Sequence, residues 1–304
     1  MIKRTLYFGN PAYLSLKLKQ LVVRMPQDED GIGSSQTKTI PVEDIGTVIL
    51  DNKQITVTQG RLEEMLENNC AVITCDSRHL PTGLLLPLSG NTIQSERFRF
   101  QTEVSLPLKK QMWQQTVQAK IRNQAAVLEY FSGETHPNMR IWADAVRSGD
   151  ADNMEARAAA YYWKNVFQGR PGFLRDQDGE GINALLNYGY AILRAVVARA
   201  LVCSGLLPTM GIHHHNRYNA YCLADDIMEP YRPFVDRLVG AMVRESGTED
   251  LTKEHKVKLL ELPVVEVNIN GKRSPLMNAI TQTSSSLVKC FLGESRKLIY
   301  PDMS

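Results

Sequence analysis

Residues 101–130, QTEVSLPLKKQMWQQTVQAKIRNQAAVLEY, decide the fold class of the larger part of this chain. From Leu108 onward the apolar residues recur with a period close to 3.6, and Gln and Lys fill the remaining positions. That period predicts an amphipathic helix with one face in a protein core. The same pattern recurs in three later segments, residues 152–168, 183–205 and 229–245.

The first 90 residues have a different texture. Short runs rich in β-branched residues are separated by turn formers such as Ser89-Gly90, and they cover residues 21–23, 47–50, 55–58 and 71–74. Such spacing is typical of a small β-rich domain. One helix is expected at Arg61–Glu67, where apolar residues fall at i, i+3 and i+4. We therefore predict an α+β protein with a β-rich N-terminal domain (1–90) and a larger, mostly α-helical domain (95–304).

Composition excludes several classes of protein. The 304 residues are 43% hydrophobic and 22% charged, which is ordinary for a soluble globular protein. The formal net charge is only +2, so any polyanion must meet a local patch of positive charge. The five cysteines show no CxxC spacing, which argues against a zinc ribbon or a disulfide framework.

The most apolar long stretch, residues 190–207, is interrupted by Arg194 and Arg199. A bilayer span needs about 20 mostly apolar residues, so this stretch predicts a buried core helix and not a membrane anchor. The first residues, MIKRTLY, contain no apolar run of the secretory type. We therefore expect a cytoplasmic protein that does not associate with a membrane.

Residues 211–216, GIHHHN, and 224–233, ADDIMEPYRP, form the densest group of chemically active side chains. Within a helical turn, Asp225 and Asp226 would share a face with Glu229 and repel it unless a cation neutralises them. Imidazole and carboxylates suit a divalent metal such as Mn²⁺ or Mg²⁺. A helix start with acidic residues is the alternative. Because consecutive histidines point in different directions, at most one or two serve a single site.

A second candidate is Glu155 in NMEARAAAYYW, residues 153–163. Helical spacing places this carboxylate on a face with Ala159, Tyr162 and Val166 that is otherwise uncharged. Burying it there without a partner is costly, so it either rims the surface or faces a cation in a cleft. No GxxxxGK[ST], GxSxG or GxGxxG motif occurs, which removes the best support for nucleotide-hydrolase and dinucleotide-binding functions.

Four motifs in this order resemble one known family. They are residues 153–159, 183–193, 205–214 and 226–233. The family is the CRISPR-associated integrases, the first-numbered Cas proteins, which insert new spacers. The motifs NYGY (187–190) and EPYRP (229–233) are most similar to members from type II systems.

The resemblance implies a metal triad of Glu155, His214 and Glu229, with Asp226 as an auxiliary ligand. His214 follows Gly211 by three positions and precedes Glu229 by 15, as in the family motif. The implied cofactor is Mg²⁺ or Mn²⁺. The implied reaction is attack by a DNA 3′-OH on a phosphodiester of the repeat, in which positioning and a cation lower the barrier.

The resemblance also implies the partners. These are double-stranded DNA with 3′ overhangs and CRISPR repeat DNA. The family works as a homodimer, with the β-rich N-terminal domain as the dimerisation domain and the helical domain as the metal- and DNA-binding catalytic domain. Two homodimers flank a dimer of a small ferredoxin-like partner subunit, which makes a heterohexamer.

Incoming spacers vary in sequence, so DNA binding is expected to rest on phosphate contacts. Segment 95–175 carries 12 Lys or Arg against 8 Asp or Glu, which a solvated helical face explains as well as a phosphate track does. Arg232 is a candidate to orient Glu229. Tyr161, Tyr162 and Trp163 either pack in the core or stack on bases. The candidate phosphate contacts are Arg97, Arg99, Lys109, Lys110, Arg122, Arg147, Arg157, Lys164, Arg170 and Arg175.

Two other functions remain open at this point. The first keeps the metal site but limits it to nuclease activity on branched or single-stranded nucleic acid, as in repair. The second is a non-catalytic DNA-binding scaffold whose acidic cluster is structural. Strand transfer into a repeat separates the first from an integrase, and a Glu155→Ala variant with unchanged DNA processing would favour the scaffold.

Overall fold

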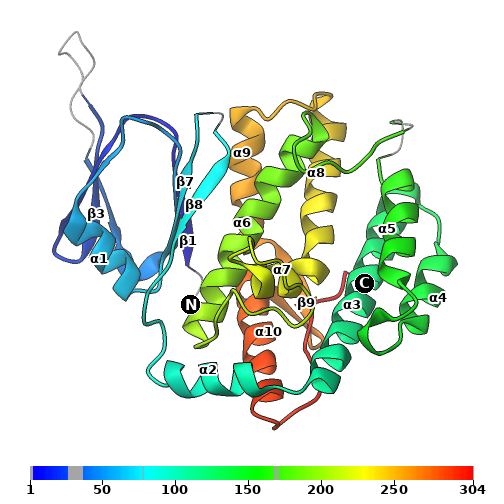
Figure 1. Cartoon of the computed structure of the whole chain (residues 1–304). Helices are drawn as coiled ribbons and strands as arrows, with labels where there is room; N and C mark the ends of the chain where they lie inside the picture. Colours follow the sequence, from blue (N-terminus) through cyan, green and yellow to red (C-terminus); the bar gives the residue numbers. More distant parts are fainter. Residues whose placement is uncertain (1–2, 27–36, 78, 168–169, 171, 304) are drawn as a thin grey trace. The chain divides into compact units, whose positions relative to one another are not determined.

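The computed structural model describes residues 3–26, 37–77, 79–167, 170 and 172–303. Contacts within the chain divide it into two compact units, Met1–Gly90 and Asn91–Ser304. Strands dominate the first unit and helices dominate the second (Figure 1), which confirms the predicted α+β class.

The first unit contains two four-stranded sheets. One has the order β1 (Arg4–Phe8), β5 (Ile45–Leu50), β7 (Ala71–Cys75), β8 (Pro81–Leu85), with only the last pair antiparallel. The other has the order β4 (Thr37–Pro41), β3 (Gln20–Arg24), β2 (Tyr13–Lys17), β6 (Thr56–Val57). Helix α1 (Gln59–Glu67) follows β6. The runs 21–23, 47–50 and 71–74 lie within β3, β5 and β7, the run 55–58 is a strand only at Thr56–Val57, and the expected helix 61–67 lies within α1.

The core of this unit explains why the runs form strands. Ile45 and Val48 of β5 are fully buried. Leu14 of β2 and Leu21 of β3 are each only 1% exposed. Met65 of α1 packs into the same cluster. Burial of such side chains contributes roughly 1.5–3 kcal/mol each. The β-branched residues therefore stabilise both sheets and the helix that joins them.

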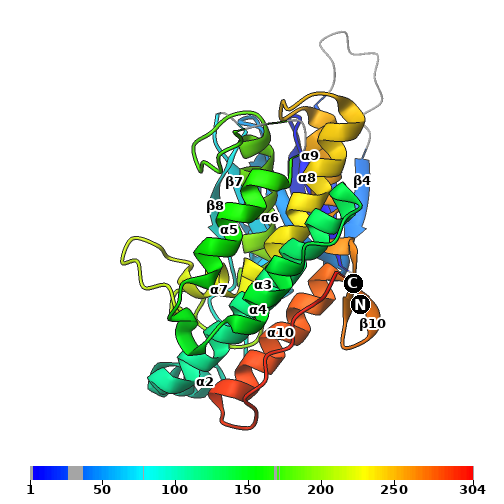
Figure 2. The ribbon, with the colours of Figure 1, turned by 90° about the vertical axis from the view of Figure 1, so that its right-hand side faces the viewer.

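The second unit is a bundle of helices (Figures 1 and 2). Helix α3 (Leu106–Ser132) carries Pro107 in its first turn and ends at Gly133, whose φ of +73° suits a residue without a Cβ. It packs against α4, α5 and α8. The other helices are α2 (Gln94–Glu103), α4 (Pro137–Ala145), α5 (Met154–Asn165), α6 (Ile182–Cys203), α7 (Cys222–Met228), α8 (Arg232–Ser246), α9 (Lys253–Leu260) and α10 (Leu276–Phe291).

Helix α6 is the core helix predicted from the apolar stretch. Over the part of the chain that the structure describes, it alone is long and apolar enough to cross a membrane, but 78% of the relevant window is buried inside the protein. It contacts α7, α8, α9 and α10. A Cβ on Gly189 would lie 2.5 Å from Val235 Cγ1 of α8, so glycine allows the two helices to pack closely. Its apolar surface is therefore covered by neighbouring helices.

The sequence pattern missed one hairpin in this helical unit. Strands β9 (Glu266–Ile269) and β10 (Lys272–Pro275) pair antiparallel across a two-residue turn. Asn270 and Gly271 both have positive φ, of 52° and 70°. Asn-Gly is the strongest short hairpin signal, and it occurs once in this unit. The expectation of a mostly helical unit left this signal unused.

Candidate active site

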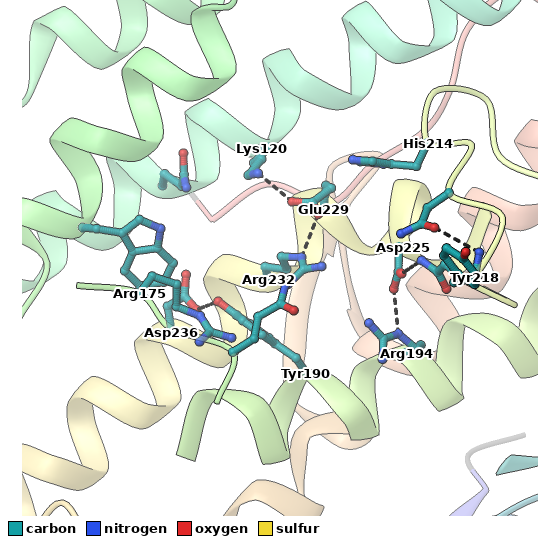
Figure 3. Close-up of a pocket in the computed structure, with 15 residues that line it drawn as sticks. Lys120, Arg175, Tyr190, Arg194, His214, Tyr218, Asp225, Glu229, Arg232 and Asp236 are labelled. Carbon is teal, nitrogen blue, oxygen red and sulfur yellow. Dashed lines mark hydrogen bonds and ion pairs between the residues drawn. The ribbon is translucent and has the colours of Figure 1, made fainter. Parts of the chain in front are cut away.

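Three side chains from different parts of the second unit converge on one point. The ammonium of Lys120, on α3, lies 2.6 Å from Glu155 Oε1 at the start of α5. It also lies 2.6 Å from Glu229 Oε2, in the 3-10 turn that links α7 to α8 (Figure 3). The side chains of Lys120 and Glu229 are only 12% and 8% exposed. Glu155 therefore faces a cation. The sequence had left open either this position or one at the rim of the surface.

Glu229 is ionised despite its burial. Burial alone would raise the pKa of its carboxyl, but Arg232 and Lys120 outweigh this and lower the pKa to about 2. Arg232 Nε lies 2.8 Å from Glu229 Oε1, as expected for a residue that orients this carboxylate. Burial alone would lower the pKa of Lys120. Glu229 and Glu155 outweigh this effect and raise the pKa above the ordinary value for lysine. All three groups are charged at neutral pH.

A short segment before α7 presents His214 to the same place. Its Nδ1 lies 2.5 Å from Oδ1 of the fully buried Asp226. The other oxygen of Asp226 accepts the backbone N–H groups of Ile212 and His213, at 2.7 and 2.9 Å. A Cβ on Gly211 would meet the carbonyl oxygen of His214 at 2.3 Å, so the fold of this segment requires glycine there.

The first two of the three consecutive histidines have different environments. The ring of His213 stacks on Trp113 of α3, with centroids 4.1 Å apart and planes 2° from parallel. Burial lowers the pKa of His213. His214 meets the same indole edge-on and lines the cleft described below. The hydrogen bond that His214 donates to Asp226 raises the pKa of His214. The structure therefore brings His214 to the carboxylates, while His213 packs on Trp113.

Asp226 has a role that sequence reasoning did not assign. Its two oxygens accept hydrogen bonds from the 212–214 segment, so it holds His214 in place. Its assignment as an auxiliary metal ligand stays a prediction. Among the described residues no group of three or more His, Cys, Asp or Glu is arranged as a metal cage. The Lys120 ammonium lies between the two carboxylates instead.

Lys120, His214 and Glu229 lie along a cleft of about 660 Å³. Its polar wall contains Arg175, Arg194 and Arg232, in addition to Lys120 (Figure 3). Arg194 Nε lies 2.6 Å from Asp225 Oδ1 at the start of α7. Each acidic residue in the 225–229 segment is thus paired with a different side chain. Like charges at this spacing repel one another unless each is neutralised.

A buried carboxyl also lines this cleft. Asp236 of α8 accepts the hydroxyl groups of Tyr162 and Tyr190, at 2.8 and 2.5 Å. Burial raises its pKa to about 6 even though both tyrosines and two arginines favour the charged form. Tyr162 is fully buried, which places it in the core, whereas Trp163 lines the cleft.

The ten predicted phosphate contacts are dispersed. Only Arg175 lines the cleft. Arg97 Nη1 donates to the carbonyl of Ser204, and Arg157 lies over the Trp142 ring. Three others pair with carboxylates on the surface: Arg122 with Asp144, Arg147 with Asp152 and Arg170 with Glu249. The exposed or half-buried side chains of Arg99, Lys109, Lys110 and Lys164 lie outside the cleft lining.

Two cleft residues, Lys120 and Arg194, were missed as site residues. Lys120 falls at i+3 from Val117 and i−4 from Gln124, on the buried stripe of its helix. Arg194 interrupts the most apolar stretch of the chain. A charge on a buried helical face needs a partner, and that rule marks both positions.

The buried Glu229, the half-buried Glu155, a histidine and several arginines form a set of side chains suited to binding a phosphodiester and stabilising negative charge on it, in the helical part of an α+β fold. The sequence model described as CRISPR associated protein Cas1 matches residues 6–261. The chain belongs to the Cas1 family, which confirms the resemblance seen in its motifs.

Known proteins resemble this chain along most of its length. The CRISPR-associated endonuclease Cas1 of Neisseria meningitidis serogroup C (strain 8013) is 35% identical over 291 residues, covering 94% of this chain and 91% of that protein. A casposase bound to its integration product is 20% identical with a TM-score of 0.79, covering 98% and 92%. A Cas6-RT-Cas1–Cas2 complex matches with a TM-score of 0.73 and 18% identity, covering 98% of this chain and 36% of that one.

Proposed function

We propose that this protein is a divalent-metal-dependent DNA integrase of CRISPR adaptation. It would insert protospacer DNA into the CRISPR array by attack of a 3′-OH on a repeat phosphodiester. The observation that carries the proposal is the convergence of Glu155 and Glu229 on Lys120, which lines a cleft together with His214 and three arginines. The family name and the likeness to a casposase bound to an integration product support it.

Glu155, His214 and Glu229 are the proposed ligands of Mg²⁺ or Mn²⁺, with Asp226 auxiliary. Two carboxylates and one imidazole are a donor set that both ions accept. The carboxylates already converge on a positive charge, so the residues fit the ion once Lys120 gives way. A bound divalent ion supplies stabilisation of the negative charge that develops on the reacting phosphodiester.

The chain's own residues would do the remaining work. Asp226 holds the His214 imidazole through Nδ1, which leaves Nε2 to face the cleft. Arg232 fixes Glu229. Arg175 and Arg194 would bind non-bridging phosphate oxygens and position the DNA, with no dependence on base sequence. Because positioning and charge stabilisation dominate phosphoryl transfer, no protein nucleophile is required.

We further propose the assembly that the family implies. The β-rich unit would form a homodimer, and two such dimers would flank a dimer of a small ferredoxin-like partner subunit in a heterohexamer. The match to a complex that contains Cas2 supports a partner of that kind. The substrates would be double-stranded DNA with 3′ overhangs and CRISPR repeat DNA, in the cytoplasm.

A nuclease without strand transfer is the second candidate, favoured by the word endonuclease in the name of the Neisseria relative. A strand-transfer assay separates the two. Purified protein, with and without its partner subunit, is mixed with a short duplex bearing 3′ overhangs and a supercoiled plasmid that carries a repeat. Joining at repeat borders in Mn²⁺ or Mg²⁺, absent in EDTA, is expected of an integrase. Metal-dependent cleavage with no joined product in the presence of the partner would establish the nuclease instead.

A further inference from the structure

Lys120 occupies the position where the proposed function needs a metal ion. Its ammonium touches one oxygen of each carboxylate at 2.6 Å, and its side chain is 12% exposed. Two carboxylates held together in a buried site repel strongly unless a cation lies between them. Lys120 therefore neutralises Glu155 and Glu229 when no divalent ion is bound.

The ammonium and a divalent ion cannot share this position. Mg²⁺ binds carboxylate oxygens at about 2.0–2.1 Å, and the same oxygens are in contact with Nζ. Two cations on the same oxygens would repel each other in a poorly solvated site. Arg232 adds a third positive charge on the opposite oxygen of Glu229. Binding of the divalent ion therefore requires the Lys120 ammonium to move.

Among the described residues that line the cleft, no carboxylate is left unengaged for the displaced ammonium. Asp225 is held by Arg194 Nε at 2.6 Å and by Asn219 Nδ2 at 2.7 Å. Asp236 accepts the hydroxyl groups of Tyr162 and Tyr190. Lys120 itself lines the cleft, so its long side chain reaches the space that a substrate would fill. The anion with the right charge and position is a phosphate of the bound DNA.

We propose that Lys120 is an exchangeable counter-ion that couples metal binding to DNA binding. In the free protein it competes with the divalent ion for Glu155 and Glu229. In the complex it transfers to a non-bridging phosphate oxygen, and the metal takes its former place. This inference rests on the proposed function. By reciprocity, the factor by which DNA tightens metal binding is the factor by which metal tightens DNA binding.

Mn²⁺ binding tests this directly, because the electron paramagnetic resonance signal of free Mn²⁺ reports affinity without any need for turnover. Wild type and Lys120→Gln are titrated with Mn²⁺ alone, then with a short duplex that carries 3′-dideoxy ends and cannot be joined. Lys258→Gln is the matched control, because it removes the same charge from a lysine paired with Glu245 outside the cleft.

We expect the duplex to tighten Mn²⁺ binding to wild type by about tenfold, within the usual range of coupling between sites. Lys120→Gln should bind Mn²⁺ about tenfold more tightly than wild type without DNA, and gain less than about twofold from the duplex. Lys258→Gln should match wild type. Equal or weaker Mn²⁺ binding by free Lys120→Gln would overturn the proposal.

A Glu229→Gln variant separates this inference from the function on which it rests. If Glu229→Gln loses Mn²⁺ while Lys120→Gln matches wild type, only the role of Lys120 fails. If Glu229→Gln binds Mn²⁺ as wild type does, the metal site itself is wrong.

Destabilisation of Lys120→Gln would not hide the answer. A ligand that binds only the folded state raises its unfolding temperature. Added Mn²⁺ should therefore raise the unfolding temperature of Lys120→Gln more than that of wild type, or restore its far-ultraviolet circular dichroism if the variant is unfolded. A smaller rise, or no restoration, would contradict the proposal.

Discussion

Asp226 Oδ1 lies 2.5 Å from His214 Nδ1, while Oδ2 of the same carboxylate accepts two backbone N–H groups of the preceding residues. One buried side chain thus fixes both the path of the chain and the orientation of the imidazole. A hydrogen bond of this kind selects the tautomer that carries its proton on Nδ1, and leaves Nε2 as the ligand nitrogen.

Asp226→Asn should therefore damage the site and the fold together. An amide presents one acceptor oxygen where the carboxylate presents two, so buried N–H groups lose their partner. We expect a loss of about 10–100-fold in Mn²⁺ affinity and roughly 2–4 kcal/mol in the free energy of unfolding. Mn²⁺ titration and urea denaturation measure the two effects. Asp144→Asn, in an exposed pair with Arg122, is the control and should alter neither.

Trp113 packs against the histidine segment. Its indole is 1% exposed and stacks on His213. Trp113→Ala should cost about 3–5 kcal/mol in unfolding free energy, and it should slow strand transfer because His214 loses its support. Trp113→Phe keeps an aromatic surface and should lose less of both. Equal losses in the two variants would show that stacking on His213 does not hold the segment.

Asp236 makes a specific contribution to the pH dependence of stability. Its pKa is about 6 in the folded protein against 3.8 for the ordinary side chain, because burial disfavours the charged form. The folded state therefore binds this proton more tightly. The stabilisation that protonated Asp236 gives the folded state is fully present below about pH 4 and is lost as the pH rises through about 6. The total change in the free energy of unfolding is at most about 3 kcal/mol.

Asp236→Asn should remove that slope. Urea denaturation of wild type and Asp236→Asn at about pH 4 and about pH 7 gives the free energy of unfolding of each. The variant should become more stable relative to wild type at the higher pH. A difference that is the same at both values would mean that Asp236 does not titrate in this interval.

Arg194 should contribute one phosphate contact to DNA binding. Each contact releases counter-ions, so its loss lowers the slope of log K against log salt by about 1. Arg194→Ala and Lys258→Ala are compared by fluorescence anisotropy with a labelled duplex at several salt concentrations. The slope should fall in Arg194→Ala and stay at the wild-type value in Lys258→Ala. An unchanged slope in Arg194→Ala would remove this side chain from the DNA interface.

Local patterns predicted most of the fold. The strands at residues 47–50 and 71–74 follow from their β-branched runs, and the long helix after Leu108 follows from side-chain periodicity. The hairpin at Asn270-Gly271 depended on turn chemistry that the helical texture masked.

The site was only partly predictable. Motif order indicated Glu155, His214 and Glu229, which stay proposed ligands: His214 and Glu229 line the cleft, and Glu155 pairs with Lys120, which lines it too. Lys120 and Arg194 carry the local signal of a charge on an apolar helical face, but the carboxylate that each one meets depends on which helices pack together. The phosphate contacts that were predicted from charge alone include exposed arginines such as Arg122 and Arg147. The partners of these two are surface carboxylates.

The most direct test of the account compares strand transfer by wild type, Glu155→Gln, His214→Ala and Glu229→Gln in Mn²⁺, each with the partner subunit. Residues that act as one unit lose activity together, so each variant should lose at least about 10³-fold in joining rate, and a double variant should lose little more. Circular dichroism confirms that each variant is folded. A folded variant that joins DNA at the wild-type rate would contradict the assignment of these three residues to one catalytic metal site.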